Sequence, residues 1–321
     1  MKKSAKTLLK RKQLLGDNSR IFIGVLVVFA GLATLMLFMA RAATDSVTLE
    51  AESSTPSGSA SIVDSSDASG GKALRFGGSQ TPPPQCDNSS PGPLRIDSSF
   101  MGATTGVEVK YSVQLPEGYY DDCKQYPVMY TLHGKESSNE LFLEVALSIR
   151  PAIDEGILPE MIIVTPDSYY DGRWQNTGKG PAEDNFIKEL IPFMEQNYRV
   201  KPGAGSRLLT GFSMGGHGAF YHAAKHPQMF AATLSVDAAM SYNLSEYSGF
   251  IDQVKQHNTP IYGMGGQLCG ARTQAVFDSF NSQGADLPYV YYDLPHDYNA
   301  FLQRDRQEGW PGVRYLADHL E

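Results

Sequence analysis

The sequence of 321 residues predicts an α/β fold, with a mostly parallel sheet covered by helices on both faces. Short apolar runs alternate with amphipathic helical runs from about residue 96 to the carboxyl terminus. This alternation requires crossover connections, which are right-handed and join parallel strands. Hydrophobic residues make up 41% of the chain and charged residues 19%, so most of it can bury a core rather than stay disordered.

The first expected strand alternates apolar and polar residues and fits a sheet edge, whereas the later ones are continuous apolar runs typical of buried parallel strands. The expected strands are residues 107–115, 127–134, 161–166, 206–212, 230–237, 260–265 and 288–294. Helical periodicity between them predicts helices at 138–150, 183–198, 214–225, 248–256, 271–283 and from about 310. In such a fold the functional site lies at the carboxyl ends of the strands.

The amino-terminal region predicts a membrane anchor. Residues 21–40 carry no charge, and a helix of that length spans a hydrocarbon core of about 30 Å. The tail of residues 1–20 is basic and only Arg41 follows the segment directly, which predicts a cytoplasmic amino terminus and an extracytoplasmic body. We interpret residues 21–40 as a single-pass transmembrane signal-anchor in the cell membrane. A cleaved signal peptide, with a site at residues 40–42, is the alternative and would give a secreted protein.

Two low-complexity stretches separate the anchor from the α/β domain at 96–321. Residues 44–76 are rich in Ser and Gly, with short β-like runs. Their "VTLEAE" and "ASGGKALRFG" resemble the opening of β-sandwich carbohydrate-binding modules, so this stretch is either a remnant of such a module or a stalk. Residues 77–95 are Pro-rich and predict a semi-rigid linker.

Charge and cysteine content restrict the partners and the compartment. Residues 1–43 carry a net charge of +7 and the rest carries −15, so the body lacks the dense Lys and Arg that nucleic acid binding requires. Outside the cytoplasm, Cys86 and Cys123 could form a disulfide that ties the linker to the domain, leaving Cys269 unpaired. Three free thiols are the alternative.

The segment Gly211–Phe212–Ser213–Met214–Gly215 lies between an expected strand and an expected helix. Small residues let the chain turn tightly there and expose the serine hydroxyl, whereas a glycine-rich turn with an incidental serine is the other interpretation. The positive end of the following helix points at Ser213, and the Met214 amide can donate to an oxyanion. The amide of Lys135, after the strand ending in His133, is the second expected donor, and His133 itself is interpreted as structural.

A serine needs a histidine base to accept its proton, and His296 follows the last expected strand, where the chain order Ser, acid, His places it. Two other histidines, His222 and His226, have the i, i+4 spacing of metal ligands on the helix after Ser213. No acidic third ligand stands beside them in the sequence, so we interpret them as helix surface. The sequence therefore predicts neither a metal nor another cofactor.

Several runs together resemble one family. They are LPEGY at 115–119, the strand ending in LHG, VTPDS at 164–168, residues 189–230 with LTGFSMGGHGAFYHAAKHPQMF, and a late histidine. Across about residues 95–305 the chain resembles the esterase family of α/β-hydrolases, which includes feruloyl and acetylxylan esterases, S-formylglutathione hydrolases and mycolyltransferases. The resemblance implies an α/β-hydrolase fold, a nucleophile at Ser213, oxyanion amides at Lys135 and Met214, and a base at His296.

The acid departs from that family, whose members normally carry Asp or Glu in the loop after the penultimate strand. Here the loop is residues 265–271, GGQLCGA, without a carboxylate. We expect Asp237, at the end of the preceding strand, to replace it, with capping of the next helix as the alternative role. Asp293 points less favourably from its strand, and Gln267 could orient His296 but could not balance an imidazolium.

The expected function is a membrane-tethered extracytoplasmic serine esterase that hydrolyses carboxylic esters, with acyl groups on polysaccharide as one substrate class. The alternatives are acyl transfer of the mycolyltransferase type and a catalytically impaired surface binding protein that lacks the usual acid. Five aromatic residues are candidates for lining a sugar cleft, with rim packing as the other interpretation. They are Tyr169, Tyr170, Trp174, Tyr292 and Tyr298.

Overall fold

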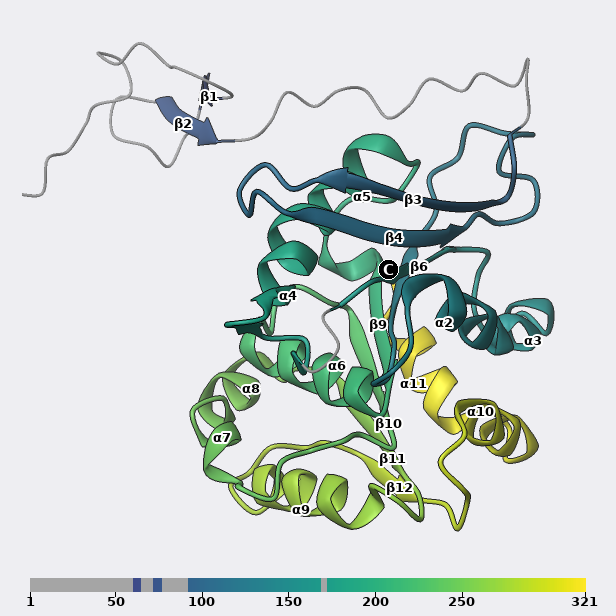
Figure 1. The fold of residues 1–321 in the computed structure, drawn as a ribbon, viewed down its shortest axis with the longest axis vertical. Helices are drawn as coiled ribbons and strands as arrows, with labels where there is room; N and C mark the ends of the chain where they lie inside the picture. Colours follow the sequence, from purple (N-terminus) through teal and green to yellow (C-terminus); the bar gives the residue numbers. More distant parts are fainter. Residues whose placement is uncertain (1–59, 65–71, 77–91, 169–171) are drawn as a thin grey trace, which may run out of the picture. The chain divides into compact units, whose positions relative to one another are not determined.

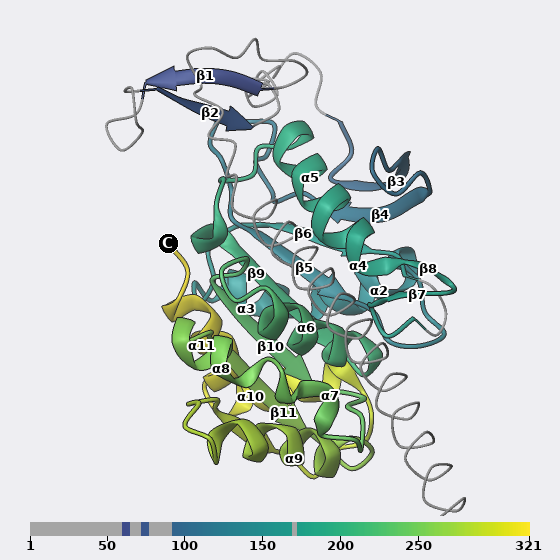
Figure 2. The same cartoon turned by 90° about the vertical axis from the view of Figure 1, so that its left-hand side faces the viewer.

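The computed structural model describes residues 60–64, 72–76, 92–168 and 172–321, and the chain divides into two units, residues 1–79 and 80–321. In the first unit, β1 (Ala60–Asp64) pairs antiparallel with β2 (Lys72–Phe76), as Figure 2 shows. The predicted basic tail and the anchor at 21–40 lie outside the described residues. No helix within the described part of the chain has the length and apolarity to cross a bilayer.

The second unit contains an eight-stranded sheet in the order β12-β11-β10-β9-β5-β6-β4-β3 (Figure 1). Its strands are β3 (Arg95–Met101), β4 (Glu108–Gln114), β5 (Val128–Leu132), β6 (Ile162–Pro166), β9 (Arg207–Phe212), β10 (Ala232–Val236), β11 (Ile261–Gly265) and β12 (Tyr289–Tyr291). The strands from β12 to β6 are parallel, and β4 and β3 add antiparallel pairs at one edge. The predicted mostly parallel α/β sheet is therefore confirmed.

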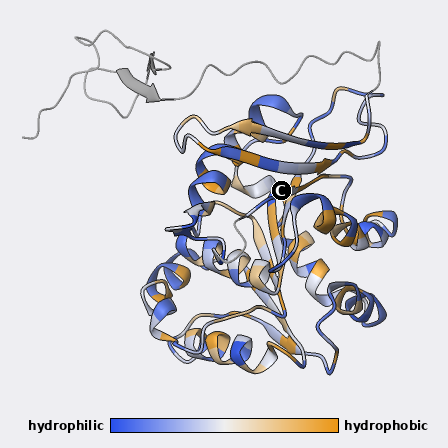
Figure 3. Ribbon diagram, viewed as in Figure 1, coloured by the Kyte–Doolittle hydropathy of each residue, from blue (hydrophilic) through white to orange (hydrophobic). Residues whose placement is uncertain are grey.

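Helices cover both faces of this sheet. One face carries α2 (Asn139–Ala146), α3 (Arg150–Asp154), α10 (Tyr298–Gln307) and α11 (Pro311–Asp318). The other, which faces the viewer in Figure 2, carries α4 (Ala182–Asp184), α5 (Ile191–Asn197), α6 (Met214–Lys225), α7 (Ser245–Ser248), α8 (Ile251–His257) and α9 (Gly270–Asn281). Alternate residues of one strand supply both cores, since Met129 packs on the first face and Tyr130 on the second. Figure 3 shows apolar strands between helices with polar outer faces.

The edge of the sheet is not where the sequence predicts it. The strand at 107–115 was expected at the edge, but the observed β4 is internal because β3 covers it along seven paired residues. The polar stretch Asp97–Ser99 hides β3 from an apolar pattern. Ser112 of β4 is fully buried, and it donates to Asp97 at 2.5 Å and accepts from Asn139 at 2.8 Å.

The carboxyl-terminal region contains a helix that the periodicity missed. The strand expected at 288–294 ends after Tyr291, and α10 begins at Tyr298. Asp297 caps α10, because its side chain accepts a hydrogen bond from the amide of Asn299 at 2.9 Å. An Asp just before a helical run is the sequence signal for such a cap. The tyrosines on both sides of Asp297 made the start of this helix hard to recognise in the sequence.

A short hairpin of β7 (Asn176–Thr177) and β8 (Gly180–Pro181) precedes α4. The helix expected at 183–198 is present as α4, a π-helical segment (Asn185–Leu190) and α5 in succession. The segment contains Glu189, whose buried carboxylate accepts hydrogen bonds from three amides of the β3–β4 turn, those of Ala103, Thr104 and Thr105 at 2.6–3.0 Å. This carboxylate therefore holds the antiparallel edge onto the helix layer.

Replacing this carboxylate tests that assignment. Glu189→Gln puts an NH₂ group where an oxygen accepts from backbone amides, and losing a hydrogen bond to a charged group costs about 1.5–3 kcal/mol. We expect that loss in the free energy of unfolding measured in urea. The control is Glu117→Gln, at a side chain that is 79% exposed, which should change it by less than about 0.5 kcal/mol. Equal effects of the two substitutions would contradict the assignment.

Candidate active site

Ser213 occupies a strained turn between β9 and α6. Its backbone has φ 57° and ψ −115°, a conformation that non-glycine residues avoid. The turn is held by backbone hydrogen bonds, since the Ser213 amide donates to Val236 and its carbonyl accepts from His217 and Ala239 at 2.8–3.0 Å. The residue is half-buried, so its side chain retains access to solvent.

Two glycines make this turn possible by close approach. A Cβ on Gly215 would lie 1.8 Å from the Leu132 carbonyl oxygen at the end of β5, and a Cβ on Gly211 would lie 2.2 Å from the Gly215 carbonyl oxygen. Both distances are far inside van der Waals contact with backbone atoms. Only glycine therefore fits where α6 starts against the sheet edge.

The two expected oxyanion donors lie beside the serine. A Cβ on Gly134 would be 3.4 Å from the Ser213 Cβ, so the residue preceding Lys135 lies against the turn. Met214 is the first residue of α6, and the first amides of a helix have no intrahelical acceptor. Both predicted amides thus belong to backbone segments that meet at Ser213.

His133 fixes the orientation of one of these segments. Its Nδ1 lies 2.7 Å from the Gly134 carbonyl oxygen, which can only accept, so Nδ1 carries the proton. Its Nε2 accepts from the amide of Ser168 at 3.1 Å. Because the amide of Lys135 points opposite to the Gly134 carbonyl across a trans peptide, this bond sets the direction of that amide.

Asp237 and His296 are in direct contact. Asp237 directly follows β10, its side chain is fully buried, and its Oδ2 lies 2.5 Å from His296 Nδ1. Its Oδ1 accepts from the amides of Gly266 and Cys269 at 2.9 and 3.2 Å. Three donors therefore converge on this carboxylate, and two of them come from the loop that lacks an acid of its own.

His296 also lies next to the serine turn. Its ring packs on Phe212, the residue before Ser213, with ring centroids 4.4 Å apart, and its side chain is 25% exposed. Among the described residues no hydrogen bond joins Ser213 to His296 in this structure. The imidazole is held between the buried carboxylate and the turn.

The two other candidates for the acid position contact each other instead. Gln267 Nε2 donates to Asp293 Oδ1 at 2.9 Å, and both side chains are exposed. Neither makes a hydrogen bond to His296 in the described part of the chain. The geometry therefore favours Asp237 as the partner of the imidazole.

The family model described as "Putative esterase" matches residues 102–283, more than half of the chain. The chain belongs to this esterase family. This confirms the resemblance that the sequence shows, and the matched residues include the serine turn between β9 and α6. The match ends before His296, so the family model itself says nothing of this histidine.

Two curated relatives of this chain are considerably longer than it is. This chain is 34% identical over 146 residues to Esterase Rv1288 of Mycobacterium tuberculosis (strain ATCC 25618 / H37Rv). The matched region covers 44% of this chain and 30% of that protein. It is also 30% identical over 143 residues to an endo-1,4-beta-xylanase/feruloyl esterase of Xylanibacter ruminicola. That match covers 41% of this chain and 20% of the relative. The chain thus matches a third or less of the length of these relatives.

Solved structures with the same fold include a ferulic acid esterase, with a TM-score of 0.62 and 21% identity over 70% of this chain and 98% of that one. An S-formylglutathione hydrolase from Staphylococcus aureus has a TM-score of 0.56 and 16% identity, with the same coverage of both chains. These likenesses show that the chain has the α/β-hydrolase fold.

The aromatic residues expected to line a sugar cleft do not do so where they are described. Trp174, Tyr292 and Tyr298 are each at most 4% exposed, and Tyr169 and Tyr170 lie outside the described residues. Trp174 instead packs edge-on against His133, at 5.0 Å between centroids, and donates from Nε1 to the His133 carbonyl at 3.1 Å. It supports the segment that leads to Lys135, a role that no pattern in the sequence indicated.

The interpretation of His222 and His226 as plain helix surface is wrong. His222 is completely buried, and Glu183, from α4, reaches the pair. Its Oε1 lies 2.9 Å from His226 Nε2. The acidic group is 39 residues earlier in the chain than His222, so spacing along the helix could not reveal it.

The cysteines are in two different states. Cys123 is disulfide-bonded, and Cys269 is a free, buried thiol. Cys86 lies outside the described residues. Cys269 lies close to Asp237 and His296, and burial raises the pKa of its thiol. It therefore contributes its backbone amide to Asp237 rather than a reactive thiolate.

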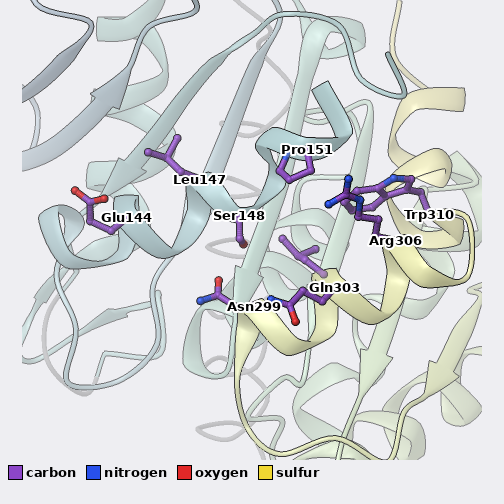
Figure 4. A pocket seen from close by; sticks show the side chains of 9 residues that line it. Glu144, Leu147, Ser148, Pro151, Asn299, Gln303, Arg306 and Trp310 are labelled. Carbon is purple, nitrogen blue, oxygen red and sulfur yellow. The ribbon is translucent and has the colours of Figure 1, made fainter. Parts of the chain in front are cut away.

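A cavity of about 410 Å³ lies between the α2–α3 segment and α10, on the face of the sheet that these helices cover (Figure 4). Its lining includes Ser148, Gln303 and Trp310. None of the predicted site residues lines it. We therefore assign no part of the site to this cavity.

The close approach at Gly215 yields a stability prediction. Gly215→Ala should lower the free energy of unfolding by at least about 3 kcal/mol, because the new Cβ meets a backbone oxygen that cannot move aside. Gly249→Ala is the matched control, since a Cβ there meets nothing within 4 Å, and it should change stability by less than about 1 kcal/mol. Thermal and denaturant unfolding measure both. Similar stabilities of the two variants would show that α6 does not press against β5.

Proposed function

We propose that this protein is a carboxylic ester hydrolase with Ser213 as nucleophile, His296 as base and Asp237 as the acid that orients the base. The observation that carries the proposal is the 2.5 Å contact between Asp237 and His296 beside the serine turn. A carboxylate in this position keeps the imidazole in the tautomer with a proton on Nδ1, which leaves Nε2 free to accept the serine proton.

The reaction proceeds in two acyl-transfer steps. Ser213 Oγ attacks the ester carbonyl and gives its proton to His296 Nε2, while the amides of Lys135 and Met214 donate to the oxyanion. The imidazolium then protonates the leaving alcohol and an acyl-enzyme remains. Water, deprotonated by His296, attacks this ester, and the serine recovers its proton as the acid product leaves.

The substrates we propose are aromatic or acyl esters of polysaccharides. Support comes from a relative named as a xylanase/feruloyl esterase and from the ferulic acid esterase with the same fold. We further propose that residues 21–40 tether the catalytic domain of 96–321 to the outside of the cell membrane, through the stretches at 44–76 and 77–95. The apolar run and its basic flank support this arrangement.

The Asp237 contact weighs against a catalytically impaired surface protein. The missing carboxylate in residues 265–271 favoured that alternative, and Asp237 supplies one from the neighbouring strand. Hydrolysis and acyl transfer of the mycolyltransferase type share every step up to the acyl-enzyme. They differ only in whether water or a sugar hydroxyl accepts the acyl group, which product analysis in the presence of an acceptor sugar decides.

Active-site substitutions test the mechanism. A fluorophosphonate probe should label the protein, and labelling and hydrolysis of p-nitrophenyl and feruloyl esters should disappear in Ser213→Ala. Asp237→Asn should lower kcat by about 10⁴-fold, the effect of losing the acid in such triads. Asp293→Asn, the control at the other nearby carboxylate, should retain nearly full activity.

The opposite pattern would reject this assignment. If Asp237→Asn retains activity while Asp293→Asn loses it, the acid is Asp293. If the folded protein is neither labelled nor active on any ester, the proposed esterase function is wrong.

A further inference from the structure

We propose that Glu183, His222 and His226 form a divalent-metal site, best suited to Zn²⁺, that joins α4 to α6. One possible ligand atom from each residue lies within 4.8 Å of the others. Two imidazoles and a carboxylate are a ligand set that zinc commonly uses, with a fourth position for water. The site lies behind the nucleophile, because His222 is nine residues, or about 13 Å, along α6 from Ser213.

Local structure already brings the ligands together. His222 lies in the last turn of α6 and His226 directly follows the helix, and their nearly parallel rings have centroids 6.4 Å apart. Glu183 comes from α4, and its carboxylate is buried against them. Glu183 Oε1 and His226 Nε2 are 2.9 Å apart, so zinc would replace the proton between these two atoms and close the remaining gap to His222.

His222 is the group that points to a ligand. It is completely buried, and within the described residues neither of its ring nitrogens makes a well-formed hydrogen bond. Its ring packs edge-on against Phe186 at 5.2 Å, and the backbone of Trp174 offers it only a long or poorly aligned hydrogen bond. A neutral imidazole offers the lone pair of one ring nitrogen to a metal ion. A buried polar group without a partner is costly, and a metal bond would satisfy it.

Glu183 is ready to act as an anionic ligand. Its Oε1 lies 2.8 Å from the Lys225 ammonium and 2.9 Å from His226 Nε2, so the carboxylate already stands beside a cation and an imidazole. A metal ion would take the place of that cation.

Lys225 is the competitor for this carboxylate. Its Nζ lies 2.8 Å from Glu183 Oε1 and 3.0 Å from the Tyr221 hydroxyl. A zinc ion on Glu183 would displace this ammonium, whose side chain is 37% exposed and can turn toward solvent. Lys225 should therefore weaken metal binding, and removing its charge should strengthen it. A purely structural ion-pair cluster would show no such gain.

A test of metal binding must distinguish this site from a second cluster of possible ligands. Asp237, Cys269 and His296 also lie within 4.8 Å of one another, and zinc bound there would block the proposed base. The two sites differ in chemistry, because only the second contains a thiol. Cobalt distinguishes them, since a bound thiolate adds a sulfur-to-metal charge-transfer band that imidazole and carboxylate ligands do not produce.

The test uses the full-length protein stripped of metal and titrated with Zn²⁺ and Co²⁺. In a Cys269→Ser background we expect one tightly bound zinc per chain by calorimetry and a Co²⁺ spectrum without a thiolate band. Zinc at about 100-fold above Kd should raise Tm by about 5 °C or more. His226→Gln should weaken zinc binding by more than about 100-fold, the upper range for losing a group that only supports a ligand.

Two further variants make the outcome decisive. Lys225→Met should tighten zinc binding by about tenfold, even if it destabilises the metal-free protein. His319→Ala, at an exposed histidine, should leave zinc binding unchanged. No calorimetric binding in the Cys269→Ser background, or binding that survives His226→Gln, would overturn the site. Because these readouts are binding and Tm, they stand apart from ester hydrolysis.

Discussion

The site depends on one backbone conformation, that of Ser213, which a free chain would avoid. Such a conformation costs of order 1–3 kcal/mol and persists only where its surroundings determine it. Here the surroundings are the Val236 carbonyl on one side and the start of α6, pressed against the end of β5 at Gly215, on the other. The serine keeps this conformation because the packing of three strands and a helix leaves its backbone no other position.

The contact between Asp237 and His296 depends on the same edge of the sheet. Parallel neighbours β10 and β11 end side by side, so a carboxylate after β10 lies within reach of the loop after β11. That loop, at 265–271, has no carboxylate, but it donates two amides to Asp237. The loop after β11 therefore has no carboxylate of its own, and its amides instead hold the Asp237 carboxylate that follows β10.

Local patterns in the sequence predicted most of the sheet and the serine turn, because buried strands and the glycines around Ser213 are short-range signals. They failed where contacts between distant segments decide the structure. β3 is stabilised by its ladder to β4 and by Glu189, Trp174 supports His133, and Glu183 joins the two histidines of α6. In each case the polar or aromatic residue has no local pattern that indicates its partner.

We propose that the Asp237 carboxylate holds the His296 imidazole with its proton on Nδ1. Proton NMR of the ¹⁵N-histidine-labelled protein tests it most directly, because a short hydrogen bond to a carboxylate shifts an imidazole N–H far downfield and slows its exchange. We predict one such resonance, absent in His296→Ala and moved strongly upfield in Asp237→Asn. A spectrum in which Asp237→Asn leaves that resonance in place would contradict the account.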